Sequence, residues 1–273
     1  MIADGALARE IAPAKLNLAL HVRGRLPDGR HAIETLFAFC TDGDRLAAVE
    51  SDGLSLEIGG PFAAELPLEG DNLVLRAAEA LRSAAGANSG AAIHLEKNLP
   101  VASGLGGGSA DAAATLRLLT AVWNIDPHHA EQVAPRLGSD VPACLLSLSA
   151  RGEGAGDRLT YVPLPDLSGT PVLLVNPRVA LSTAEVFAGW NGFDQGALAD
   201  WRDSGNGLEP SAMALVPQIE SVLAWLRLQR GVILARMSGS GATCFAMFED
   251  VTARDFAAEA VPREWWRLAT ELR

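Results

Sequence analysis

A glycine-rich segment carries the strongest chemical signal in the sequence. It reads Pro-Val-Ala-Ser-Gly-Leu-Gly-Gly-Gly-Ser-Ala and runs directly into a predicted helix. Unpaired N–H groups and the positive end of the dipole point out of a helix N-terminus, and glycines let a polyphosphate approach the backbone. We expect a phosphate-binding loop, with a flexible loop that merely begins the helix as the alternative. Its residues are Pro100, Val101, Ala102, Ser103, Gly104, Leu105, Gly106, Gly107, Gly108, Ser109 and Ala110.

This loop is neither of the two commoner phosphate-binding loops. A Walker A loop needs a lysine after its last glycine, and no lysine follows Gly108. The dinucleotide fingerprint needs a third glycine where Ser109 stands. The pattern therefore points to another class of nucleotide site.

Lysine is rare in this chain. Of 22 basic residues only Lys15 and Lys97 are lysines. Lysine is a compact point charge that arginine does not replace in a tight pocket. Lys15 begins an alternating segment, 15–22, which predicts a half-buried strand with Lys15 and Asn17 on one face. Lys15 is a candidate to neutralise charge on a transferring phosphoryl group, although a lone strand lysine is usually solvated. The position of Lys97 at a strand end fits either chance or function.

Two further segments carry candidate residues. Asp140 precedes Val141-Pro142, where the proline predicts extended backbone. Its carboxylate would accept or orient a hydroxyl proton during phosphoryl transfer, and a turn aspartate is the alternative. Ser-Gly-Ser-Gly-Ala at 238–242 is either a plain hairpin turn or a second loop that approaches the ligand.

Composition excludes several function classes. The 273 residues carry a formal charge of -11, which disfavours a nucleic-acid partner but allows an anionic small substrate. No apolar run approaches the ~20 residues of a membrane span, and the first residues do not form a secretion signal. The three cysteines, Cys40, Cys144 and Cys244, show no metal-ligand or disulfide spacing. We therefore expect a cytoplasmic protein without a membrane partner.

Strands and helices are intermixed without a regular βαβ cadence, which favours an α+β fold. Strands are predicted at 33–39, 54–58, 91–96, 172–175, 232–237 and 243–248. Helices are predicted at 72–85 (capped by Asp71), 110–123, 129–137 and 215–228, and another begins at the capping box that opens with Ser182. The glycines at 151–157 suggest a division into an ATP-binding domain, 1–155, and a substrate-binding domain, 156–273.

Taken together, these motifs resemble the GHMP kinase superfamily over nearly the whole chain. Residues 13–18, the glycine loop and residues 237–242 resemble its first, second and third motifs. Asp-Gly-Arg-His at 28–31, Glu-Thr-Leu at 34–36, Asp-Asn-Leu at 71–73 and residues 137–142 resemble one branch, whose members act on a cytidine-diphosphate-linked methylerythritol in non-mevalonate isoprenoid synthesis. The implied fold is ribosomal-S5-domain-2-like in the N-terminal half and ferredoxin-like in the C-terminal half.

The resemblance also implies roles for particular residues. ATP, with Mg²⁺, would give its γ-phosphoryl to the 2-hydroxyl of the methylerythritol unit, with Asp140 as base or hydroxyl orienter and Lys15 as its electrostatic partner. Lys97 would lie beside the nucleotide. Phe187 would stack on cytosine, with ordinary core packing as the alternative. The implied substrate-binding residues are Asn17, Arg30, His31, Thr183, Phe187 and Gly239.

One position departs from this pattern. The branch usually has tyrosine where this chain has Arg30, and that tyrosine closes one face of the cytosine. Because a guanidinium plane can stack on a base, we expect Arg30 to take its place.

Two rival interpretations remain. Another GHMP kinase, acting on homoserine, mevalonate or a sugar, would share the glycine loop but lack the Asp-Gly-x-His segment. An RNA-binding relative would share the N-terminal fold, since fold does not fix function. Acidic charge and the pairing of Lys15 with Asp140 speak against the latter. The pattern assigns no oligomeric state and no metal ligand beyond a suggestion at Ser109.

Overall fold

The computed structural model describes residues 7–66 and 72–273, which form an α+β fold with two β-sheets. Two compact units divide the chain. The first takes its described residues from Met1–Ala14, Asp42–Val101 and Gly106–Ser147, and the second from Lys15–Thr41, Ala102–Leu105 and Leu148–Arg273. Strands β1 (Ala8–Arg25) and β2 (His31–Ser51) contribute residues to both. A single boundary at residue 155 stays a prediction.

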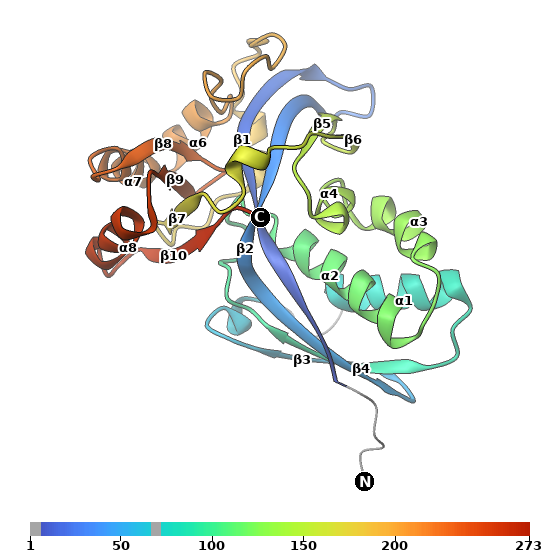
Figure 1. The fold of residues 1–273 in the computed structure, drawn as a ribbon. Helices are drawn as coiled ribbons and strands as arrows, with labels where there is room; N and C mark the ends of the chain where they lie inside the picture. Colours follow the sequence, from blue (N-terminus) through green and yellow to red (C-terminus); the bar gives the residue numbers. More distant parts are fainter. Residues whose placement is uncertain (1–6, 67–71) are drawn as a thin grey trace. The chain divides into compact units, whose positions relative to one another are not determined.

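The described residues of the first unit combine strands with the α-helices α1 to α4, which Figure 1 labels. The last part of β2 pairs antiparallel with β4 (Gly90–Glu96), and β3 (Leu54–Gly59) pairs parallel with β4. Helix α1 (Leu73–Ala85) makes the crossover that a parallel pair requires. The other helices are α2 (Gly107–Val122), α3 (His128–Leu137) and α4 (Val141–Leu146).

Helix α2 follows the glycine loop and is buried along much of its length. Alanines at 110 and 112–114 are fully buried, so their small side chains let neighbouring elements pack closely. Asp111, also buried, is the charged exception within this apolar stretch. Because a buried carboxylate needs partners, its position calls for a cation or donor nearby.

The second unit holds a short hairpin and a four-stranded antiparallel sheet. Strand β5 (Ala150–Gly154) pairs with the first part of β2 and with β6 (Arg158–Tyr161). The larger sheet has the order β10-β7-β9-β8. With α7 and α8 between its strands, this order is ferredoxin-like, as expected. The bounds are β7 Pro171–Asn176, α5 Thr183–Ala188, α6 Glu209–Leu215, α7 Gln218–Arg227, β8 Val232–Met237, β9 Cys244–Phe248, α8 Val251–Ala260 and β10 Trp266–Glu271.

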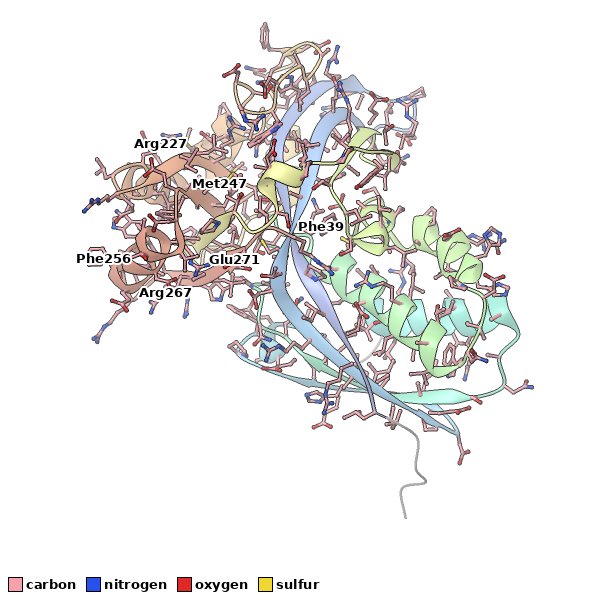
Figure 2. All side chains as sticks on the ribbon, viewed as in Figure 1. Phe39, Arg227, Met247, Phe256, Arg267 and Glu271 are labelled. Atoms are coloured by element: carbon pink, nitrogen blue, oxygen red, sulfur yellow. The ribbon has the colours of Figure 1, made fainter. Side chains whose placement is uncertain are left out.

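The end of the chain is joined to β2 within the second unit. The Arg273 N–H donates to the Phe39 carbonyl at 2.9 Å, and Cys40 and Leu272 form an antiparallel bridge. Figure 2 labels Phe39 and Glu271, which mark this place. The contact fixes the first part of β2, which carries the predicted site residue His31 together with Thr35 and Phe37.

Three local predictions were wrong. The segment 15–22 is a strand, but it is buried on both faces, so its polar side chains do not face solvent. Val141-Pro142 is not extended but begins α4, because proline is tolerated in the first turn of a helix. The helix predicted over 215–228 is interrupted at Val216-Pro217, and α7 begins only at Gln218.

The predicted cap of α1, Asp71, lies outside the described residues. Asn72 occupies the cap position, and its side-chain oxygen accepts a hydrogen bond from the Val74 N–H at 2.9 Å. Gly86 ends the helix in the left-handed conformation at φ 62°, which glycine adopts without steric cost.

Candidate active site

The glycine loop passes through both units, and its central part lies against the loop after β8. Gly104 has φ +79°, and a Cβ there would lie 2.3 Å from the Ser238 carbonyl oxygen. The Ser238 hydroxyl donates to the Gly104 carbonyl at 3.0 Å, and the Thr243 N–H donates to the Ser103 carbonyl at 3.1 Å. Close backbone contact therefore requires glycine at 104.

The end of the loop forms the start of α2. Gly106 takes the left-handed conformation at φ 64° and occupies the N-cap position. A Cβ at Gly107 would lie 3.0 Å from the Lys97 ammonium, whereas one at Gly108 would meet Leu73 at 3.4 Å. The backbone N–H groups of the first turn are thus presented by a glycine segment, as anion binding requires.

Lys15 lies in a buried polar cluster of the second unit. Only 3% of its surface is exposed, and its ammonium donates to Asn17 Oδ1 at 3.0 Å and lies 4.5 Å from the centre of the Phe37 ring. Its backbone N–H donates to the Leu105 carbonyl at 2.9 Å. Asn17 Nδ2 donates to Thr35 Oγ1 at 2.8 Å. Lys15 and Asn17 therefore share one oriented cluster beside the glycine loop.

The loop at 238–242 completes this cluster, so it is more than a plain hairpin turn. The Asn17 N–H donates to the Ser238 hydroxyl at 3.3 Å, and a Cβ at Gly239 would lie 3.2 Å from Asn17 Oδ1. Asn206 Nδ2 donates to the Gly239 carbonyl at 2.8 Å. Thr183 Oγ1 and Ser240 Oγ are hydrogen-bonded at 2.9 Å. Four predicted residues, Lys15, Asn17, Gly239 and Gly104, are thus brought together.

Lys97 lies in a second buried cluster, in the first unit. Its side chain is 1% exposed, and the ammonium donates to Asp44 Oδ2 at 2.5 Å and to Asp111 Oδ2 at 2.6 Å. Burial alone would lower the pKa of Lys97, but Asp111 and Asp44 outweigh it and raise that pKa. Burial, with the Asp44 carboxylate beside it, raises the pKa of Asp111 to about 8, although Lys97 acts in the opposite direction.

Asp140 lies in the first unit at the start of α4. It occupies the N-cap position, and its carbonyl accepts a hydrogen bond from the Cys144 N–H at 3.0 Å. The residue is partly exposed. Because Asp140 and Lys15 belong to different units, their convergence on one reacting oxygen stays a prediction.

Three rings lie together where the base-binding residues were predicted. His31 stacks on Phe187 with ring centres 4.9 Å apart and meets Trp190 edge-on at 5.6 Å. Burial lowers the pKa of His31, and the positive charge of Arg25 acts in the same direction. Among the described residues, His31 Nε2 is buried without a hydrogen-bond partner. The neutral ring therefore keeps one nitrogen for a ligand.

Arg30 lies beside this group but is held by carboxylates. Its Nε donates to Asp28 Oδ2 at 2.8 Å, and its Nη1 lies 3.5 Å from Asp157 Oδ2. The side chain is 54% exposed. Stacking of Arg30 on a base stays a prediction, and it would require the guanidinium to keep or exchange these partners.

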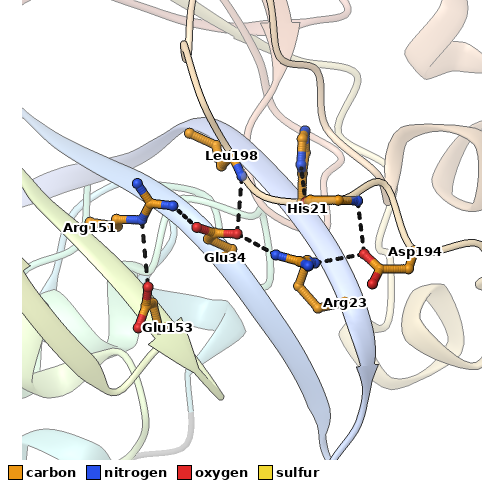
Figure 3. Close-up of polar contacts among 8 residues, drawn as sticks. His21, Arg23, Glu34, Arg151, Glu153, Asp194 and Leu198 are labelled. Carbon is orange, nitrogen blue, oxygen red and sulfur yellow. Dashed lines mark hydrogen bonds and ion pairs between the residues drawn. The ribbon is translucent and has the colours of Figure 1, made fainter.

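Glu34 joins three segments of the second unit (Figure 3). Its carboxylate accepts from Arg23 Nη1 at 2.7 Å and from the Leu198 N–H at 3.0 Å, and it pairs with Arg151. Arg23 Nε also donates to Asp194 at 2.6 Å. The network fixes the segment that follows Trp190 against β1, β2 and β5.

Sequence reasoning missed three residues of these clusters. Asp44 gave no local signal, because its partner Lys97 is 53 positions away. Asp111 did give a local signal, since a carboxylate at the alanine-rich start of a helix predicts a buried partner. Trp190 also gave a local signal, because it follows Phe187 by one helical turn and would lie on the same helix face as Phe187.

Two kinds of feature are absent from the described residues. Across residues 7–66 and 72–273, no group of three or more His, Cys, Asp or Glu side chains is arranged to hold a metal ion. Within the same ranges, no helix is both long and apolar enough to cross a membrane.

Comparison with known proteins defines the class. Residues 72–147 match the GHMP kinases N terminal domain, and residues 189–268 match the GHMP kinases C terminal family. A solved homoserine kinase from Cytophaga hutchinsonii has a TM-score of 0.71 at 17% identity, covering 100% of this chain and 96% of that one. At that identity the likeness concerns the fold alone.

Two closer relatives narrow the assignment. A 4-diphosphocytidyl-2-C-methyl-D-erythritol kinase of Rhizorhabdus wittichii is 50% identical, covering 97% of this chain and 94% of the relative. A crystal structure of 4-(cytidine 5'-diphospho)-2C-methyl-D-erythritol kinase has a TM-score of 0.81 at 34% identity, covering 97% and 98% of the two chains. The chain therefore belongs to the 4-diphosphocytidyl-2-C-methyl-D-erythritol kinase family of the GHMP kinases, and it is an ATP-dependent small-molecule kinase. This confirms the resemblance and the fold expected from the sequence.

Proposed function

We propose that the protein transfers the γ-phosphoryl group of ATP to the 2-hydroxyl of 4-diphosphocytidyl-2-C-methyl-D-erythritol, a step of isoprenoid precursor synthesis. The observation that carries the proposal is the buried cluster of Lys15, Asn17 and Ser238, which is hydrogen-bonded to the Gly104 carbonyl of the glycine loop. A cation held beside a phosphate-binding loop is what phosphoryl transfer requires of a protein. The names of relatives such as the one from Rhizorhabdus wittichii support the choice of acceptor.

In this proposal, Lys15 and Asp140 act at the reacting oxygen. The Lys15 ammonium stabilises the charge that develops on the transferring group, because Asn17 and the Phe37 ring orient it in a buried setting. Asp140 accepts or orients the hydroxyl proton of the acceptor. Asn17 holds the acceptor end, and Gly239 allows the acceptor to approach the backbone.

The cytidine end of the substrate binds near the three rings. Cytosine presents both donors and acceptors along one edge, and His31 Nε2 is a buried nitrogen without a partner in the described structure. Phe187 stacks on the base, and Trp190 supplies a second ring beside it. Thr183 lies near the cytidine, and Arg30 covers the remaining face.

ATP would bind the glycine loop together with Mg²⁺. Magnesium in kinases is held by one or two protein groups together with phosphate oxygens, so it does not need a cluster of three side chains. Ser109 is the residue that we assign to it, and the ion supplies neutralisation of phosphate charge when bound. Lys97 belongs to the nucleotide side of the site.

We also propose a cytoplasmic location. The three cysteines, Cys40, Cys144 and Cys244, are buried, and none of them forms a disulfide within the described residues. Reduced thiols fit a reducing compartment, where disulfides are rare.

The experiment is an assay of ADP release against a panel of alcohols. The panel contains 4-diphosphocytidyl-2-C-methyl-D-erythritol, homoserine, mevalonate and galactose, each at matched concentration. We expect turnover of the cytidine substrate at least about a hundredfold above the others in kcat/KM, because a polar site rejects ligands that leave its groups unpaired. Phosphorylation of another alcohol with equal kcat/KM would remove the proposal, and the phosphorylated carbon, located by NMR, tests the 2-hydroxyl.

A further inference from the structure

We propose that Lys97 is a positioning residue that holds the two ends of the glycine loop in register through Asp44 and Asp111, without touching the nucleotide itself. The inference rests on the proposed binding of ATP by this loop. It gives the Lys97 side chain a role in nucleotide affinity that is separate from direct contact.

The geometry connects the residues before the loop to the helix after it. Asp44 Oδ1 accepts hydrogen bonds from the Asn98 N–H at 2.6 Å and the Leu99 N–H at 2.8 Å, so it fixes the start of the loop. Asp44 Oδ2 accepts from Lys97 Nζ at 2.5 Å. The same ammonium donates to Asp111 Oδ2 at 2.6 Å, on the first turns of α2.

The backbone of Lys97 is itself fixed by hydrogen bonds to residues that follow β3 or end it. Its backbone N–H donates to the Gly59 carbonyl at 2.8 Å, and its carbonyl accepts from the Phe62 N–H at 3.2 Å. Gly60 takes φ +92°, and a Cβ there would lie 2.6 Å from the Lys97 carbonyl oxygen. The anchor of the cluster is therefore the end of β3, which is rigidly paired with β4.

The ammonium lies directly against the loop's helical end. A Cβ at Gly107 would lie 3.0 Å from Lys97 Nζ, so the glycine is in contact with the charged group. The lysine side chain is 1% exposed, and the two carboxyl side chains are 0% and 3% exposed. A group so enclosed acts on a ligand through the backbone that it holds, which is how supporting residues preorganise a site.

The charges of Lys97, Asp44 and Asp111 are consistent with a structural role in which the ammonium links the two carboxyl groups. Buried charges are tolerated when they are paired and hydrogen-bonded, and removal of one partner leaves the others uncompensated. Asp44 and Lys97 form an ion pair, and Asp111 supplies a further oxygen acceptor. Among the described residues, Asp111 Oδ1 has no hydrogen-bond partner, so the contact of Asp111 with Lys97 is made through Oδ2 alone.

The test compares two substitutions at Asp111 with one at Lys97. Asp111→Asn keeps an oxygen for the ammonium at the same place, whereas Asp111→Leu has similar bulk and no acceptor. The dissociation constant of a non-hydrolysable ATP analogue, AMPPNP with magnesium, is measured by calorimetry. We expect a rise of about tenfold in Asp111→Leu and in Lys97→Met, and of less than about threefold in Asp111→Asn.

Further readouts separate positioning from general loss of structure. Hydrogen exchange at the amides of residues 106–111 should accelerate in Asp111→Leu, whereas amides of α8 should not change. In steady-state assays the KM for ATP should rise while the KM for the acceptor stays within about twofold. Glu79→Gln, which removes an exposed partner of Arg82 on α1, is the matched control and should bind AMPPNP as the wild type does.

Asp111→Leu keeps the Lys97–Asp44 pair, so the test survives if Lys97→Met does not fold. Equal AMPPNP affinity in the wild type and Asp111→Leu would overturn the inference, as would an equal loss in Asp111→Asn and Asp111→Leu. Because AMPPNP binding needs no acceptor, a wild type that binds it but ignores the cytidine substrate would refute only the proposed function.

Discussion

The two lysines of the chain lie in two different buried clusters. The Lys97 side chain, 1% exposed, lies between two carboxyl groups at 2.5 and 2.6 Å. Lys15, 3% exposed, lies 3.0 Å from an amide oxygen and 4.5 Å from the centre of an aromatic ring. One belongs to the end of the glycine loop at Gly107 and the other to its centre at Leu105.

The difference shows how one residue type serves two purposes. Carboxylates neutralise an ammonium and fix it, so the charge of Lys97 holds protein to protein. Lys15 is oriented by Asn17 and the Phe37 ring beside the centre of the glycine loop, where we propose that its charge acts on the transferring group. We therefore expect loss of Lys15 to slow the chemical step and loss of Lys97 to weaken nucleotide binding.

The largest expected effect is on turnover after substitution of Lys15. Lys15→Met keeps the length of the side chain and removes its charge. We expect kcat to fall by about 10³-fold, equivalent to about 4 kcal/mol of barrier lowering. The KM for ATP should change much less than in Lys97→Met. A near-normal kcat at saturating substrates would show that Lys15 does not act in the chemical step, and it would contradict the proposed difference between the two lysines.

An effect of the same order is expected at Asp140. Asp140→Asn is isosteric but cannot accept the hydroxyl proton, so kcat should fall by about 10³-fold at saturating ATP and acceptor. AMPPNP affinity, measured by calorimetry, should stay within about threefold of the wild type. If affinity falls while turnover persists, Asp140 is part of the nucleotide site instead.

The two ends of the glycine loop should differ in their tolerance of a methyl group. Gly104→Ala places a Cβ 2.3 Å from the Ser238 carbonyl at φ +79°, and we expect the free energy of unfolding to fall by about 3 kcal/mol. Gly108→Ala meets only Leu73 at 3.4 Å inside a helix, where alanine is preferred by about 1 kcal/mol. Urea denaturation of both variants checks this, and equal destabilisation would contradict the close contact at Gly104.

The Lys97 cluster should also make stability depend on pH. The pKa of Asp111 is raised to about 8 in the folded state, chiefly by burial and by Asp44, from 3.8 in the absence of these effects. Its contribution to stability is therefore present at pH values below the unfolded pKa and is lost as pH rises through about 8. Between these values, the wild type should lose stability relative to Asp111→Asn by up to about 1.4 kcal/mol per pH unit.

Urea denaturation of the wild type and Asp111→Asn at pH 5, 6, 7 and 8 provides the measurement. Glu79→Gln serves as a control, because an exposed carboxylate should add little pH dependence in this range. A constant difference between wild type and Asp111→Asn would show that Asp111 is ionised throughout.

The smallest expected effect concerns Arg30, an exposed cation with two carboxylate partners. Exposed pairs contribute up to about 1 kcal/mol, so Arg30→Ala should barely change the melting temperature. If its guanidinium stacks on cytosine, the KM for the cytidine substrate should rise about threefold in Arg30→Ala. Arg30→Tyr should restore it. Michaelis constants that match the wild type in both variants would exclude the stacking role.

Much of the secondary structure around the site could be predicted because it depends on local sequence patterns. The Gly-rich run and the alanines after it predict the start of α2, and Asn72 and Gly86 occupy the positions that commonly begin and end a helix. The alternation after Lys15 predicts a strand, although the pattern cannot show that a second layer covers its polar face. Burial of both faces depends on segments far away in the chain.

The parts that could not be predicted depend on tertiary partners. No local motif indicates that Asp44 is the partner of Lys97, because Asp44 lies 53 positions earlier in the chain. Val141-Pro142 illustrates a local conflict, because the rule for residues before proline gave way to the tolerance of proline in a first helical turn. The aromatic group at His31 combines β2 with Phe187 of α5 and with Trp190, and no spacing in the sequence connects His31 with either of these residues.

The near absence of lysine from the surface has a practical consequence for spectroscopy. Selective isotopic labelling of lysine would give two side-chain signals, one from an ammonium between carboxylates and one from an ammonium beside a ring. Since the pKa of Lys97 is raised, its signal should keep the chemical shift of the charged form beyond the usual titration range. Titrating each ligand would then show which signal responds to nucleotide and which responds to acceptor, without any substitution in the chain.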